Sequence, residues 1–133
     1  MANGFSTYLS QNLINHTLRG QASTAPANHY LALFSSDPTD DNVTVNEVAG
    51  AWYARQTTGA WAAPVGSGNS TSNSNQIQFS AVTGSSITVS HWAIYDASTS
   101  GNLLYTGAFT TPKTFNVGDV AIVGAGQLAI TID

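Results

Sequence analysis

The chain has 133 residues, of which only 8% are charged, whereas an ordinary soluble domain has roughly 25%. The net charge of −4 and three scattered basic residues exclude nucleic-acid binding, which needs clustered Lys and Arg, and no apolar stretch approaches the ~20 residues of a membrane span. Disulfides and thiolate metal sites are excluded because there is no cysteine, and the length and the 42% hydrophobic content predict a single domain over residues 1–133.

The first predicted element is an amphipathic helix over residues 1–20. Phe5, Leu9 and Leu13 recur every four residues, as they do on one face of a helix. Asn3 is the expected N-cap, and the glycine at the last position of this range is expected to take the left-handed conformation that ends a helix.

Nearly everything after this helix is predicted to form short strands separated by turns. The expected strands cover residues 28–35, 52–58, 76–82, 87–95, 102–109, 120–123 and 127–132. The first of them is apolar on both faces, as expected of a strand buried between layers. Residues 64–75 are rich in Gly, Ser and Asn and are expected to form a flexible polar loop. The predicted fold is mainly β: an antiparallel β-sandwich or jelly-roll-like domain with one N-terminal α-helix.

A glycine motif near the end of the chain has the pattern of a dinucleotide-binding turn. Gly124-Ala125-Gly126 follows an apolar strand, but the dinucleotide fingerprint also requires a helix after the glycines. Leu128 and Ile130 alternate with other residues as in a strand, so we interpret the glycines as a tight turn between two strands. No cofactor is predicted.

Metal and catalytic sites are also not predicted. Asp37, Asp40 and Asp41 lack the spacing of a calcium loop and are interpreted as a solvated turn. The three histidines lack the spacing of zinc ligands, and no serine lies in a nucleophile elbow. We therefore expect no catalytic residue and no enzymatic activity.

Several short motifs, in a fixed order, resemble a family of small virion proteins of tailed phages that are often labelled phage tail fibre proteins. They are Phe5-Ser6-Thr7-Tyr8-Leu9, Leu13-Ile14-Asn15-His16, Tyr30-Leu31-Ala32-Leu33-Phe34, Asp37-Pro38-Thr39-Asp40, Tyr53-Ala54-Arg55-Gln56, His91-Trp92-Ala93-Ile94-Tyr95-Asp96-Ala97, Gly101-Asn102-Leu103-Leu104 and Ala125-Gly126-Gln127-Leu128. The resemblance runs over almost the whole chain and implies a structural role in a virion.

The sequence shows none of the repeats or coiled-coil heptads of a fibre shaft. A compact domain with few charges therefore favours a capsid decoration, or cement, protein that binds the major capsid protein and stabilises the shell, with sister copies forming a homo-oligomer on the particle. Docking is expected through a low-charge face or through the N-terminal helix, because uncharged polar surface is less costly to desolvate than charged surface. The alternative is a tail-associated or receptor-binding component that binds host-surface glycans.

Three side chains are candidates for an interface. Arg19 and Arg55 are two of only three cations, and each is expected to pair with a carboxylate, either of the capsid or of this chain. Trp61 is expected at the start of a loop, where an exposed ring could belong to a sugar-stacking platform or pack on the core instead. No small-molecule ligand is predicted.

Overall fold

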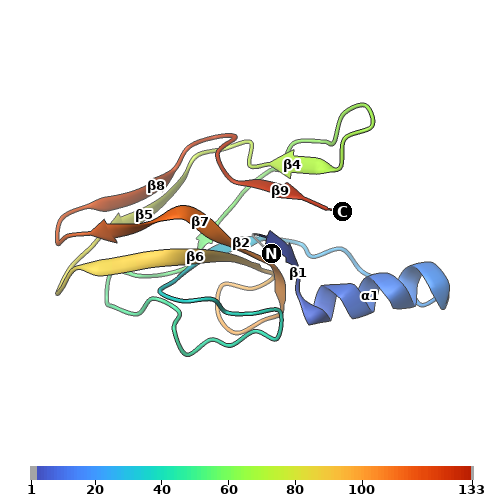
Figure 1. Ribbon diagram of the computed structural model, residues 1–133, viewed down its shortest axis with the longest axis horizontal. Coiled ribbons are helices and arrows are strands. Elements are labelled where there is room, and N and C mark those ends of the chain that lie inside the picture. Colours follow the sequence, from blue (N-terminus) through green and yellow to red (C-terminus); the bar gives the residue numbers. More distant parts are fainter. Residues whose placement is uncertain (1–2, 133) are drawn as a thin grey trace.

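The computed structural model describes residues 3–132, which form one helix and nine strands (Figure 1). Strand β1 (Asn3–Phe5) leads directly into helix α1 (Thr7–Leu18). The other strands are β2 (Tyr30–Phe34), β3 (Gln56–Thr57), β4 (Ser70–Ser72), β5 (Ile77–Ala81), β6 (Ile87–Tyr95), β7 (Leu103–Phe115), β8 (Val120–Val123) and β9 (Ala129–Thr131). Residues 1–2 and 133 belong to the predicted domain and lie outside the described residues.

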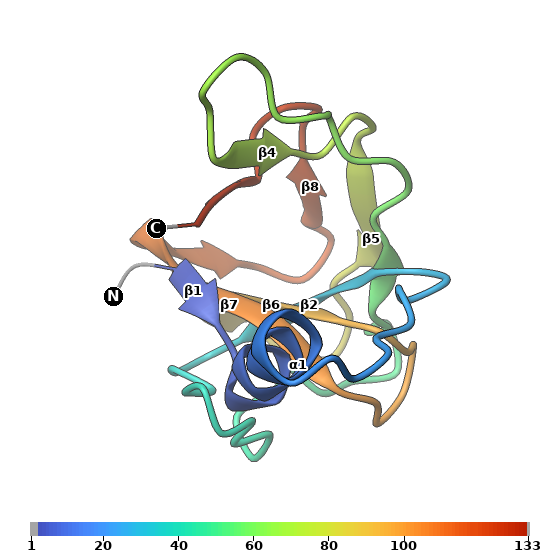
Figure 2. The ribbon, with the colours of Figure 1, turned by 90° about the vertical axis from the view of Figure 1, so that its right-hand side faces the viewer.

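The strands form two layers. One layer is a five-stranded sheet in the order β1-β7-β6-β2-β3, and the other consists of two strand pairs, β4-β9 and β5-β8 (Figures 1 and 2). Every pairing between these strands is antiparallel. The predicted mainly β, antiparallel sandwich with a helix near the N-terminus is confirmed.

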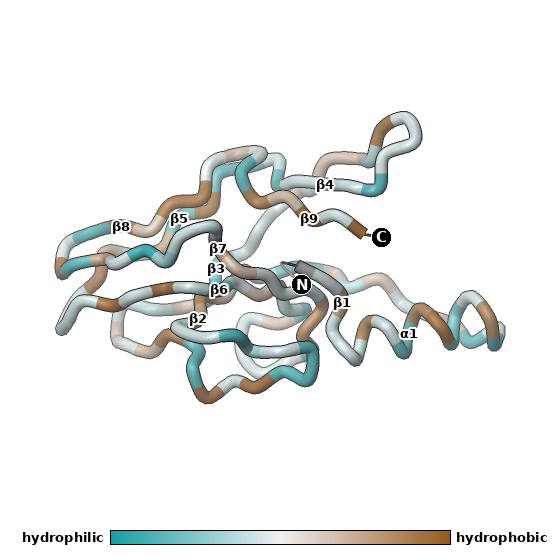
Figure 3. Tube along the Cα trace, viewed as in Figure 1, coloured by the Kyte–Doolittle hydropathy of each residue, from teal (hydrophilic) through white to brown (hydrophobic). Residues whose placement is uncertain are grey.

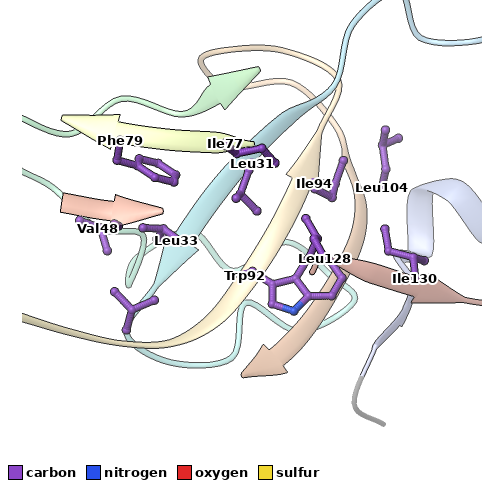
Figure 4. Close-up of a cluster of buried hydrophobic side chains, with 12 residues drawn as sticks. Leu31, Leu33, Val48, Ile77, Phe79, Trp92, Ile94, Leu104, Leu128 and Ile130 are labelled. Carbon is purple, nitrogen blue, oxygen red and sulfur yellow. The ribbon is translucent and has the colours of Figure 1, made fainter. Parts of the chain in front are cut away.

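The main hydrophobic core fills the space between the two layers. It takes residues from both of them: Leu31, Leu33, Val48, Ile77, Phe79, Val89, Trp92, Ile94, Leu104, Ala121, Leu128 and Ile130 (Figure 4). The alternate residues of β2, Ala32 and Phe34, face the opposite side of the sheet and pack with Tyr95 in a second, smaller cluster. Strand β2 is therefore buried on both faces, as its apolar sequence predicts.

Helix α1 is shorter than predicted, because residues 3–5 form the edge strand β1 instead. The backbone of Phe5 pairs with Tyr105 of β7, so the helix begins only after this strand. Ser6 is the N-cap, and its hydroxyl accepts a hydrogen bond from the Leu9 backbone N at 3.0 Å. The expected cap at Asn3 is therefore wrong. Gly20 has a φ of +67° directly after the helix, as predicted.

The predicted polar loop over residues 64–75 is partly wrong, because strand β4 lies within it and pairs with β9. The side chain of Asn73, which is buried, connects the loop to the turn between β8 and β9. Its Nδ2 donates to the Gly124 carbonyl at 3.0 Å, and its Oδ1 accepts from the Leu128 backbone N at 2.9 Å. The polar composition of β4 predicts a loop and gives no sign of a strand. Its short hydroxyl side chains nevertheless do not prevent its backbone from pairing with β9.

Strand β7 extends beyond its predicted end at residue 109. His91 pairs with Ala108 and Val89 pairs with Lys113, so residues 109–112 bulge out opposite Ser90 of β6. Pro112 lies in this bulge, where its missing N–H costs no ladder hydrogen bond. The bulge lets the pairing resume and continue to the end of β7.

The glycines after β8 form a turn, as predicted. The Gln127 backbone N donates to the Gly124 carbonyl at 3.1 Å, and Gly126 has a φ of +78°. Strand β9 follows this turn where a dinucleotide site would need a helix.

Candidate interaction surface

Arg55 forms an ion pair within the chain. Its Nε and Nη2 donate to Oε2 and Oε1 of Glu47, both at 2.8 Å, and its Nη1 donates to the carbonyls of Ala97 at 3.2 Å and Ser100 at 2.7 Å. The Arg55 side chain is only 6% exposed. Its guanidinium is thus occupied by intramolecular partners, which is the alternative that the sequence left open.

Two tyrosines complete what we call the arginine cluster (Glu47, Tyr53, Arg55 and Tyr95). The Arg55 guanidinium lies 3.7 Å from the centre of the Tyr95 ring, a cation–π contact. The Tyr53 hydroxyl donates to Oε2 of Glu47 at 2.9 Å, and the Tyr95 hydroxyl donates to Oδ1 of Asn42 at 2.6 Å. Burial raises the pKa of Tyr95 to about 12, against a smaller opposing effect of Arg55, and burial also raises the pKa of Tyr53. Through these contacts the cluster holds the segment between β2 and β3, which includes Glu47 and Arg55, against Tyr95 of the five-stranded sheet.

Arg19 has a different environment, directly after the end of α1. Its Nη1 donates to Oδ1 of Asn15 at 2.9 Å, and the residue is exposed. Within residues 3–132 it takes part in no salt bridge. Its charge is therefore accessible to a partner.

Trp61 lines a cleft of about 280 Å³ between the β4-β9 pair and the five-stranded sheet. We call it the apolar cleft, because most of its lining side chains are apolar: His29, Trp61, Pro64, Asn69, Ser70, Thr71, Ile94, Tyr105, Ile130 and Ile132. The indole Nε1 of Trp61 donates to Oγ1 of Thr58 at 3.0 Å, so its polar atom is bonded within the chain. Burial lowers the pKa of His29, which is therefore neutral at pH 7, and no lining side chain carries a charge.

Helix α1 extends away from the β layers, and none of its residues is buried (Figures 1 and 2). Its apolar side chains include Leu13, Ile14 and Leu18, which are 44%, 52% and 80% exposed. Figure 3 shows hydrophobic segments along this helix, which projects from the β layers. The sequence predicted an apolar stripe, but a stripe that faces the protein's own core has the same spacing as one that faces another molecule.

The base of α1 is nevertheless held firmly. The Ser6 hydroxyl donates to the Leu103 carbonyl of β7, the Thr7 backbone N donates to the Asp40 carbonyl at 2.9 Å, and the Thr7 hydroxyl donates to Oδ1 of Asp41 at 2.7 Å. These bonds join the first turn to the sheet and to the loop that contains Asp37, Asp40 and Asp41, which we call the acidic loop. They fix the direction in which the exposed part of the helix extends.

The acidic loop is a turn, as interpreted from the sequence. The Asp37 carboxylate accepts a hydrogen bond from the Thr39 backbone N at 2.8 Å. In the part of the chain that the structure describes, no group of three or more His, Asp or Glu side chains is placed to bind a metal ion. No helix among the described residues is long and apolar enough to cross a membrane.

The model of a protein family described as podophage GP4 fiber I protein gp80 matches residues 4–131. No curated protein matches the sequence. The matched range includes α1, the arginine cluster and every residue that lines the apolar cleft except Ile132.

Proposed function

The chain belongs to the podophage GP4 fiber I protein gp80 family and is a phage virion structural protein, and we propose that it is a tail-associated fibre component that acts by binding other virion proteins. The observation that carries this proposal is the family match over nearly the whole chain. The role requires no reaction and no cofactor, and the protein contributes a rigid body and an attachment surface.

The surface that best suits attachment is the end of the molecule that carries α1 and the apolar cleft. Between Thr7 and Leu18 the helix has no Asp, Glu, Lys or Arg, and the cleft has none either. The costliest step in forming an interface is to remove water from charged groups. A surface without charged groups avoids this step. Arg19 directly follows α1 and is exposed, so a carboxylate of a partner can reach it.

Capsid decoration, which the sequence alone favoured, becomes the second candidate after the family match. The compact shape of a chain that has no shaft-like segment in its described residues still favours it. In that case the partner is the major capsid protein, and the chain stabilises the shell. The two candidates place the protein at different parts of the same particle, so a single measurement separates them.

The decisive measurement is immunogold labelling of intact virions with an antibody against this chain, read by electron microscopy. We expect gold at the tail. Gold spread evenly over the heads would contradict the tail assignment and support decoration. As a control, antibody absorbed with the purified chain should leave the particles unlabelled, and mass spectrometry of purified particles should detect the chain itself.

A glycan-binding role is tested separately. Trp61 is the aromatic residue for which the sequence left both a sugar platform and core packing open, and it packs partly against the core. Its cleft is mostly apolar, whereas a sugar also needs hydrogen-bonding groups around the ring. We therefore expect the Trp fluorescence of the purified protein to remain unchanged when host-surface polysaccharide is added. A saturable shift that is lost in Trp61→Ala would overturn this expectation.

A further inference from the structure

We propose that α1 of one copy of this chain docks into the apolar cleft of a second copy. The inference takes from the proposed function only its setting in a virion, and the contact itself can be tested on purified protein. Figures 1 and 2 place α1 and the β4-β9 pair at the same end of the molecule. One end therefore carries both an apolar projection and an apolar recess.

The helix needs a partner on energetic grounds. Isolated helices of fewer than about 12–15 residues are marginal in water, and α1 has 12 residues, none of them buried. The first turn is capped and hydrogen-bonded to the rest of the chain, but these bonds stabilise only the N-terminal end of the helix. Ile14 and Leu18, one helical turn apart, remain 52% and 80% exposed.

The cleft has a size that suits these two side chains. An apolar cavity of about 150 Å³ holds one benzene molecule, so a cleft of about 280 Å³ has room for roughly two side chains of that size. Ile132 lies among the residues that line the cleft and is 37% exposed, whereas Ile94 and Ile130 are buried in it. A helix that brings Ile14 and Leu18 together would fill this space.

The charges favour a second copy of the chain as the occupant. The chain carries a net charge of −4, which opposes self-association through most of its surface. Neither α1 nor the lining of the cleft contains an Asp, Glu, Lys or Arg residue, so this contact brings no carboxylates together. If the occupant of the cleft came from an unrelated protein, nothing would require α1 of this chain to lack charged residues as well.

The base of α1 also lies next to the lining of the cleft. Phe5, the residue before the N-cap of α1, lies with its ring centre 5.7 Å from that of Tyr105, which lines the cleft. The firm base of α1 fixes its direction away from its own cleft, so the helix is presented to a neighbour. Because each copy carries both halves at one end, two copies can exchange helices reciprocally in a closed dimer.

Disulfide trapping tests the contact directly, because the natural sequence has no cysteine. Leu18→Cys and Ile132→Cys proteins, mixed in equal amounts and oxidised, should form a disulfide-linked pair that contains one copy of each. Val45→Cys is the matched control, since Val45 is also 80% exposed and lies outside both α1 and the cleft. Mixed with Ile132→Cys, it should form no such pair above the level of random collision.

Sedimentation measures the same contact without a cross-link. We expect the natural chain to dimerise, and Leu18→Asp to raise the dissociation constant about tenfold or more, whereas Val45→Asp leaves it unchanged. Near-UV circular dichroism of each variant checks that it is folded. A natural chain that stays monomeric up to the highest soluble concentration would overturn the proposal, and so would a dimer in which Leu18→Cys and Ile132→Cys do not cross-link. Neither result affects the labelling of virions, so the two proposals fail separately.

Discussion

The arginine cluster and helix α1 use their side chains in opposite ways. In the cluster, four of the five N–H groups of Arg55 are bonded to atoms of the same chain, and the side chain is almost fully buried. In α1 the polar groups of the first turn are bonded, but the apolar side chains beyond it are left in water. The cluster therefore serves the stability of the monomer, whereas the helix leaves apolar side chains available to another molecule.

The largest expected effect is at the cluster. Arg55→Ala leaves the Glu47 carboxylate unpaired at a site that is 17% exposed, and we expect it to lower the free energy of unfolding by about 3 kcal/mol, measured by urea denaturation. Arg19→Ala is the matched control, because Arg19 is exposed and its side chain, among the described residues, donates only to Asn15; its cost should stay below about 0.5 kcal/mol. Equal losses in the two variants would erase the contrast between the two regions.

The tyrosines of the cluster should make the protein sensitive to alkali. The pKa of Tyr95 is about 12 in the folded chain and about 10 when unfolded, so between these values the unfolded state binds fewer protons and stability falls as pH rises. We expect a loss of about 1.4 kcal/mol per pH unit for each tyrosine held neutral by folding. Urea denaturation at pH 9, 10, 11 and 12 measures it, and Tyr95→Phe should reduce the slope. A flat profile up to pH 12 would contradict the burial of these phenols.

A smaller effect is expected at the base of the helix. Ser6→Ala removes the N-cap and the hydroxyl that donates to the Leu103 carbonyl, and should cost about 1–2 kcal/mol together with part of the helical signal in far-UV circular dichroism. Ser10→Ala, within the helix, is the control and should change the stability by less than about 0.5 kcal/mol. If the two variants behave alike, Ser6 does not anchor α1.

The smallest effect on folding should come from the exposed end of the helix. At concentrations where the chain is monomeric, Leu18→Ser should change the free energy of unfolding by less than about 0.5 kcal/mol, because Leu18 is 80% exposed. Leu33→Ala, at a position only 3% exposed, should cost about 3 kcal/mol in the same assay. A large loss at Leu18 would mean that the helix stabilises its own monomer.

The sequence predicted the elements in which local pattern and tertiary environment agree. Strands β6 and β8 have the predicted bounds, because alternating side chains and flanking turns define them locally. The end of β7 was missed because the proline within it reads as a strand breaker, and only the pairing with β6 shows that it lies in a bulge. Strand β4 was missed because its polar residues pair with a strand some sixty residues further along the chain.

The candidate site was predictable to a similar degree. Sequence reasoning selected Arg55 and offered two kinds of partner, but Glu47 becomes its partner only when the segment between β2 and β3 folds back on the sheet. It placed Trp61 at a loop, and the structure adds the strand pair that makes the cleft beside it. The exposure of Ile14 and Leu18 had no local signal, because the direction of a helix is set by its anchors.

The way α1 is fastened also determines how the molecule would carry mechanical load. Figure 1 shows the helix extending along the longest axis, the direction in which β6 and β7 also run. The helix is joined through β1 to β7, which in turn pairs with β6 along most of its length. Tension applied to the helix would therefore reach the sheet through the pairing of β1 with β7, and strands pulled along their length resist with all of their shared backbone hydrogen bonds together instead of one after another.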